Sequence, residues 1–246
     1  MEWQHTASGS FREPGAVVFQ AWYFAAMRVL LTLGLLVATA SGAQALEHDV
    51  DSWTVLNVWG RHDRFRWYLE AQPRVSLTQR KFDRLLLRPA VGYQVSPNVS
   101  LWVGYGWTPS FIPSYRDEQR PWQQVLVEHK FGVVSLVNRS RVEERFIANT
   151  DGASIRVRHM VRSVIRFGAE SPWGVALYDE IFFTLNTVTN GPVAGFDQNR
   201  VFAGINLKVA EWQFELGYMN NFVERPAPSA DRMNHNITAM IVFTVP

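Results

Sequence analysis

The stretch SIRVRHMVRSVIRFGAE, residues 154–170, decides the fold class. Arginine occupies positions 156, 158, 162 and 166, and the opposite parity carries Ile155, Val157, Val161, Ile165 and Phe167. Successive side chains of a β-strand point to opposite faces, whereas a helix repeats every 3.6 residues. The alternation therefore predicts a strand with one guanidinium face and one apolar face.

The same period of two recurs along most of the chain from Leu46 onward. Turn residues separate the segments, as expected of consecutive strands. Besides the opening stretch, the segments are Phe65–Thr78, Phe82–Val95, Asn98–Thr108, Trp122–Phe131, Val133–Phe146, Trp173–Asn186, Phe196–Val209, Trp212–Phe222 and Asn236–Val245. A further candidate, Trp53–Gly60, makes eleven.

Two architectures fit such two-faced strands. In a soluble sandwich or lipocalin-like barrel the apolar face points inward, whereas in a membrane barrel it meets lipid. The polar faces are rich in Arg and Glu and poor in Lys, which favours an enclosed, ion-paired interior. We therefore expect an all-β, antiparallel up-and-down transmembrane β-barrel. Bacterial barrels close with even strand numbers, so we expect about ten strands, with twelve as the alternative.

Aromatic side chains near strand ends support the membrane interpretation. Tryptophan and tyrosine gather at the two membrane–water interfaces of such barrels. The residues expected in these girdles are Trp102, Tyr105, Trp107, Trp122, Trp173, Trp212 and Tyr218.

The N-terminal region predicts export. From Met27 a single Arg precedes an apolar run, Val29–Ala38, and Ala43 and Ala45 form the A-x-A pattern of a signal peptidase site. We expect translation to start at Met27, cleavage after Ala45, and one barrel domain over 46–246, with residues 1–45 forming an upstream extension plus signal peptide. The expected location is the outer membrane of a Gram-negative cell after Sec-type export, with outer-membrane lipid and the barrel-assembly machinery as partners.

Composition excludes several classes. The chain has 246 residues, no cysteine and a formal net charge of +2, which gives little support for a nucleic-acid partner and none for disulfides or thiolate metal sites. We find no P-loop, dinucleotide-binding or HExxH motif, and we predict neither a cofactor nor a metal.

The chain resembles the bacterial family called Domain of Unknown Function 2490, described as outer-membrane β-barrel proteins. The resemblance rests on LLLRPAVGY (85–93), LWVGYGW (101–107), RPWQQ (120–124), RSRVEERF (139–146), LYDEIFF (177–183) and FDQNRVFAGI (196–205). It implies a fold and a location but no activity. The ending departs from that of many outer-membrane proteins, because Phe243 is followed by three more residues.

Parity places a charge network in the lumen, in which arginine outnumbers glutamate. Its expected members are Arg66, Glu70, Arg74, Arg84, Arg88, Glu128, Arg139, Arg141, Glu143, Arg145, Arg156, Arg158, Arg162, Arg166, Glu180, Arg200 and Glu215. One hypothesis is a structural network that holds the barrel rigid. The alternative is a narrow pore or binding chamber that favours a small anionic solute, because unpaired guanidinium groups attract anions.

A lipid-modifying enzyme is the second alternative, but no catalytic set emerges. His129 and His159 fall on the apolar parity, and His235 lies beside an expected outer loop. Asp179 and Glu180 are adjacent, so alternation sends them to opposite faces. In FDQNR we expect Asp197 and Asn199 to point outward, and Phe196, Gln198 and Arg200 to share the lumen parity.

Overall fold

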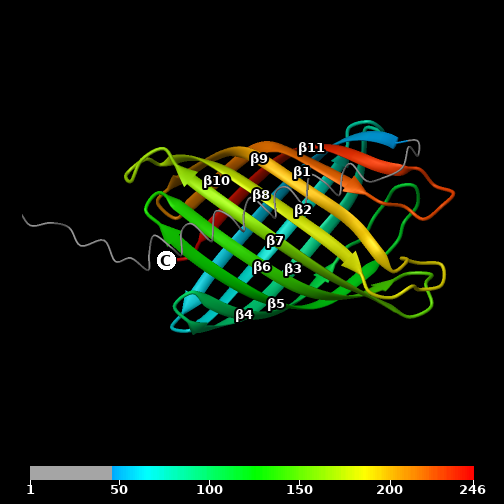
Figure 1. Cartoon of the computed structure of the whole chain (residues 1–246), viewed down its shortest axis with the longest axis horizontal. Coiled ribbons are helices and arrows are strands. Elements are labelled where there is room, and N and C mark those ends of the chain that lie inside the picture. Colours follow the sequence, from blue (N-terminus) through cyan, green and yellow to red (C-terminus); the bar gives the residue numbers. More distant parts are fainter. Residues whose placement is uncertain (1–45) are drawn as a thin grey trace, which may run out of the picture. The chain divides into compact units, whose positions relative to one another are not determined.

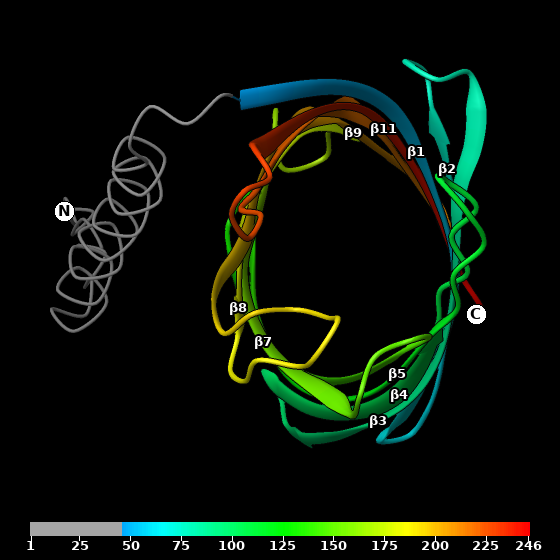
Figure 2. The ribbon, with the colours of Figure 1, turned by 90° about the vertical axis from the view of Figure 1, so that its right-hand side faces the viewer.

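Residues 46–246, the part of the chain that this computed structural model describes, form a closed barrel of eleven strands (Figures 1 and 2). The strands are β1 (Leu46–His62), β2 (Phe65–Ser76), β3 (Lys81–Ser96), β4 (Val99–Trp107), β5 (Glu118–Phe131), β6 (Val134–Ile147), β7 (Ala153–Arg166), β8 (Trp173–Thr184), β9 (Gly195–Val209), β10 (Trp212–Val223) and β11 (Asp231–Thr244). The expected all-β barrel is confirmed. The expected signal peptide and upstream extension lie outside the described residues.

No helix within residues 46–246 is long and apolar enough to cross a membrane.

The barrel closes through a parallel seam between its first and last strands. Every other neighbouring pair is antiparallel, but β1 pairs with β11 in parallel, from Leu46 opposite Asp231 to Trp59 opposite Thr244. The expected count of ten, or alternatively twelve, was therefore wrong. The segment 53–60 belongs to the closing strand. In an up-and-down barrel with an odd number of strands, the first and last strands run in the same direction, so only parallel hydrogen bonding can join them.

The connections differ between the two ends of the barrel. We call one end the turn end; its connections are residues 63–64, 97–98, 132–133, 167–172 and 210–211. The other, the loop end, carries residues 77–80, 108–117, 148–152, 185–194 and 224–230. The C-terminus lies at the turn end, whereas β1 begins at the loop end (Figure 1). Figure 2, which faces the loop end, shows the 185–194 loop reaching partly across the opening.

Alternation along the strands gives the wall two chemically different faces. Large apolar side chains are exposed on the outside, for example Leu69 (52%), Val103 (54%) and Leu216 (61%). Charged side chains lie inside, together with two buried apolar clusters. One cluster gathers around Trp102 and Trp122, and the other around Trp53, Phe202 and Met219.

Candidate lumen network

A polar cavity of about 1190 Å³ occupies the interior of the barrel. Fifteen arginines and nine Asp or Glu side chains of the described chain contribute to its lining. Of the expected network, the lining includes Arg66, Glu70, Arg74, Arg84, Arg88, Glu128, Arg139, Arg141, Arg145, Arg156, Arg158, Arg162, Glu180, Arg200 and Glu215. We call the ion-paired charges of this interior the lumen network.

Two expected members do not line the cavity. Glu143, which is 1% exposed, lies behind the lining but is ion-paired with the network. Arg166 is the last residue of β7, and its Nη1 donates a hydrogen bond to the carbonyl oxygen of Pro172, 2.5 Å away, in the turn that follows. Arg166 therefore stabilises a turn, and among the described residues it makes no ion pair with the lumen network.

Glu143 is the deepest carboxylate of the network and contacts three arginines. Its Oε2 accepts hydrogen bonds from Arg156 Nη2 at 2.5 Å and Nε at 3.1 Å. Its Oε1 lies 3.2 Å from Arg158 Nη1 and 3.6 Å from Arg141 Nη1. Glu143 and Arg156 face each other directly across β6 and β7, so the strand register itself makes this pair.

Arg158 joins Glu143 to a second centre at Glu180. The Arg158 Nε lies 3.1 Å from Glu180 Oε1, which also accepts a hydrogen bond from Arg139 Nη2 at 2.7 Å. The more distant Arg200 Nη1 lies 3.8 Å from Glu180 Oε2. These contacts connect β6, β7, β8 and β9 across the interior, so they couple strands that are not neighbours in the sheet.

Smaller groups of charges complete the network. Arg88 pairs with Glu70 at 3.1 Å, and the carboxylate of Glu215 accepts hydrogen bonds from Arg162 and, at 2.7 Å, from Asn206. Toward the turn end, Arg66 and Glu128 are 3.5 Å apart and more exposed, at 29% and 44% of their side chains.

The sequence prediction missed a tight pair at the loop end. Glu118 accepts hydrogen bonds from Arg120, at 2.5 and 2.7 Å, and from Arg145 Nε, at 2.6 Å. We had expected this strand to start at Trp122, but β5 begins at Glu118. The period of two could have revealed this, because Glu118, Arg120, Trp122 and Gln124 all have the parity that faces the lumen.

Asp197 corrects a parity assignment. We expected it to point outward, but its Oδ2 accepts a hydrogen bond from Arg156 Nη1 at 3.0 Å and it lines the cavity. The cause is an extra residue in β9. Gln198 lies opposite Phe182 and Phe196 lies opposite Phe183, so Asp197 has no partner on β8. The residues of β9 before this irregularity therefore face the opposite side of the wall from the one that simple alternation predicts. Phe196, expected inside, instead contacts the ring of the outward Phe183.

Trp102 and Trp122 correct the aromatic prediction. They are 2% and 1% exposed and pack in the interior, not at the outer surface. Both have lumen parity, and each indole lies over a glycine of the neighbouring strand: a Cβ at Gly92 or Gly104 would come within 2.4 or 2.2 Å of the ring. The guanidinium of Arg141 stacks over Trp122 at 3.8 Å, which adds a cation–π contact.

The other five expected girdle residues are exposed on the outer face. Their exposures are 40% for Tyr105, 37% for Trp107, 47% for Trp173, 44% for Trp212 and 47% for Tyr218. Trp107 ends β4 at the loop end, whereas Trp173 and Trp212 begin β8 and β10 at the turn end. Tyr218 lies in the middle of β10, and its hydroxyl is 2.6 Å from His235 Nδ1.

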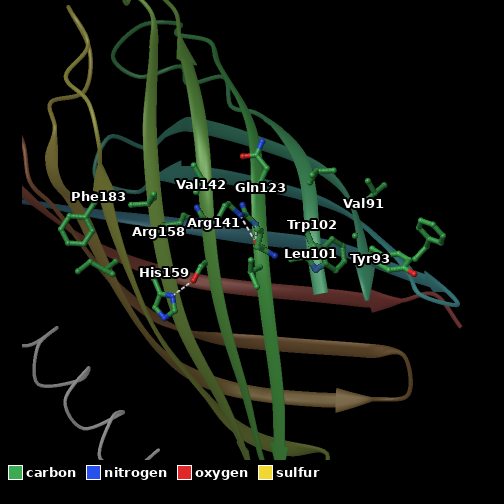
Figure 3. A pocket seen from close by; sticks show the side chains of 18 residues that line it. Val91, Tyr93, Leu101, Trp102, Gln123, Arg141, Val142, Arg158, His159 and Phe183 are labelled. Carbon is green, nitrogen blue, oxygen red and sulfur yellow. Dashed lines mark hydrogen bonds between the residues drawn. The ribbon is translucent and has the colours of Figure 1, made fainter. Parts of the chain in front are cut away.

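An apolar groove of about 820 Å³ marks the outer wall over β2–β8, where Figure 3 shows His159, Val142 and Phe183. In it the Ser140 hydroxyl lies 2.9 Å from His159 Nδ1. A serine hydrolase needs a third group to orient the histidine and donors for an oxyanion. Among the contacts of the described residues, His159 has no such carboxylate or amide partner. Asp179 and Glu180 do point to opposite faces: Asp179 binds Asn199, and Glu180 lies in the network.

Comparisons with known proteins agree with the resemblance found in the sequence. The chain is 29% identical over 218 residues, covering 85% of this chain and 93% of the relative, to an uncharacterized protein of Methylorubrum extorquens. No solved structure matches. The model of the family "Protein of unknown function (DUF2490)" matches residues 50–234. The chain belongs to the Domain of Unknown Function 2490 family.

Proposed function

We propose that this chain is an outer-membrane β-barrel, exported by the Sec route and folded by the barrel-assembly machinery, whose lumen network braces the wall. The observation that carries the proposal is the inverted polarity of the wall: ion pairs such as Arg156–Glu143 are buried inside, whereas leucine and valine are exposed outside. An outer face this apolar would drive aggregation in water but is solvated by lipid tails.

Fractionation tests the location. In cells that export the chain, the protein should sediment with the outer membrane and should migrate faster on an unheated gel than on a heated one. Recovery in the soluble periplasmic fraction, without a heat-dependent shift, would refute the proposal.

A second role, an anion-favouring passage or binding chamber, is supported by the excess of arginine over carboxylate in the cavity lining. The purified protein in a planar bilayer should then conduct anions better than cations under a KCl gradient. A cation preference would refute this role, and an absence of conductance would leave only the chamber.

We assign no catalytic step to the chain. If the chain did hydrolyse lipid, the candidate site would be the Ser140–His159 pair, which lies among apolar neighbours in the groove of Figure 3. Incubation of the purified protein with phospholipid in mixed micelles should release no fatty acid. Release that disappears in Ser140→Ala would reverse this assignment.

A further inference from the structure

The arginines that line the lumen are not equally paired. Among the described residues, Arg61, Arg74 and Arg84 make no ion pair; Arg61 lies at the turn end, whereas Arg74 and Arg84 face each other across β2 and β3. Arg156, Arg158 and Arg139 each contact a carboxylate within 3.2 Å. Arg74 and Arg84 have no carboxylate within the 4.0 Å limit of an ion pair among the described residues. Both line the cavity, near the loop end of β2 and β3.

Arg74 is held in place without being neutralised. Its side chain is buried, at 8% exposure for the residue, and its Nε and Nη2 donate to the neutral Gln72 Oε1 at 3.2 and 2.6 Å. Its guanidinium stacks on the ring of Trp53 at 3.6 Å. These contacts fix the direction of the guanidinium group without giving it an ion pair.

Two more guanidinium groups lie around the same place. Arg84 has a buried Nε without a hydrogen-bond partner, and Arg200 lies 5.0 Å from the Trp53 ring. Arg200 is bound to the neutral Asn221 and Gln198, and its carboxylate contact is the long one of 3.8 Å. The charges of Arg84 and Arg200 both repel that of Arg74.

The nearby carboxylates balance these charges only in part. Asp51 and Asp83 line the same cavity; Asp83 attracts Arg74 and Arg84, and Asp51 attracts Arg74, but neither carboxylate makes an ion pair with these arginines among the described contacts. Of the other neighbours, Arg120 is already paired with Glu118. Buried like charges are held together only at a cost, which a bound counterion would remove.

We propose that Arg74, Arg84 and Arg200 form a binding site for a phosphate group, which lies in the loop-end half of the lumen beside Trp53. Three guanidinium groups suit a dianion with several acceptor oxygens, because the planar fork of arginine binds phosphate through paired hydrogen bonds. The proposal rests on the binding-chamber role given above, and it names the ligand chemistry of that chamber. The phosphate could belong to a free solute or to a lipid headgroup.

Calorimetric titration tests the site with the whole exported protein refolded in detergent. Inorganic phosphate should bind at one site, and Arg74→Gln and Arg84→Gln should each weaken binding at least tenfold. Neither substitution leaves a carboxylate unpaired, so both variants should still show the heat-dependent gel shift. The matched control is Arg66→Gln, which removes the same charge from the lumen face of the same strand at the turn end and should change affinity less than twofold.

The outcomes separate the site from the other proposals. No binding of phosphate, or equal weakening by Arg74→Gln and Arg66→Gln, would overturn the site while leaving the outer-membrane location intact. Phosphate binding that competes with short-chain phosphatidic acid would point to a headgroup, and binding that the lipid does not affect would point to a free solute. Failure of the gel shift in the unaltered protein would instead overturn the barrel's membrane location.

Discussion

Replacing Glu143 with glutamine should destabilise the barrel far more than the same substitution at an exposed carboxylate of the lumen. Glutamine has nearly the same shape, so the change removes the charge and leaves the packing. Three guanidinium groups contact this carboxylate: Arg156 at 2.5 Å, Arg158 at 3.2 Å and Arg141 at 3.6 Å. The side chain is 1% exposed, so water cannot take over those contacts.

The expected size follows from burial. Breaking a buried ion pair by neutralising one partner costs about 3–5 kcal/mol, because the remaining charge stays buried without compensation. Arg158 keeps Glu180 at 3.1 Å and Arg156 keeps Asp197 at 3.0 Å, which argues for the lower end, about 3 kcal/mol. The matched control is Glu128→Gln: that carboxylate is 44% exposed and 3.5 Å from Arg66, so its loss should cost about 0–1 kcal/mol.

Urea unfolding in detergent micelles, followed by tryptophan fluorescence, measures both changes. If uncompensated charge is the cause, the double variant Glu143→Gln, Arg141→Gln should be more stable than Glu143→Gln alone, because Arg141 makes no ion pair other than that with Glu143 among the described residues. Equal midpoints for Glu143→Gln and Glu128→Gln would refute the reasoning, and so would a double variant in which the two costs simply add.

Three further predictions concern the wall and its topology. Gly104→Ala should destabilise by about 1–3 kcal/mol and reduce the folded fraction on unheated gels, because the new Cβ would lie 2.2 Å from the buried Trp122 ring; Gly106→Ala, with its nearest contact at 3.5 Å, is the control. Leu69→Arg should cost about 2–4 kcal/mol in urea unfolding, if the outer wall faces lipid at its midplane. An epitope placed before Leu46 should be accessible to antibody on intact cells, whereas one at the carboxyl terminus should not, because β1 begins at the loop end; labelling of both or neither would contradict this topology.

The sequence was sufficient for the fold class because the hydrophobic period is a local property. Alternation over 154–166 is visible without any partner strand, and the burial of side chains in β7 follows it from Ala153 to Met160. The parallel seam could not be found in the same way. Nothing within Leu46–His62 distinguishes a strand that will pair with β11 in parallel from an additional element.

The predicted facing of side chains was wrong for two reasons. In one place a register irregularity interrupts the alternation, and in another the usual location of tryptophan was given more weight than the position of the residue in the strand. The β8–β9 irregularity near Phe183 turned Asp197 inward, and a one-residue shift of this kind leaves no clear mark in the sequence. Trp102 was different. Its parity was visible between the outward Leu101 and Val103, and Gly92 on the neighbouring strand provides the space for the ring. The tendency of tryptophan to lie at interfaces misled the prediction there.

The pairing of the charges depends on tertiary geometry that parity cannot give. Parity places Arg74 and Arg139 alike in the lumen, but Arg139 reaches Glu180 at 2.7 Å, 41 residues away and across an intervening strand, whereas Arg74 reaches only Gln72. That contrast depends on the depth of each residue in the barrel and on which side chains face it across the cavity. An arginine excess can therefore be counted from the sequence, but only the closed barrel shows that part of it gathers beside Trp53. This gathering at one place is the reason to expect a defined phosphate site and not a diffuse positive field.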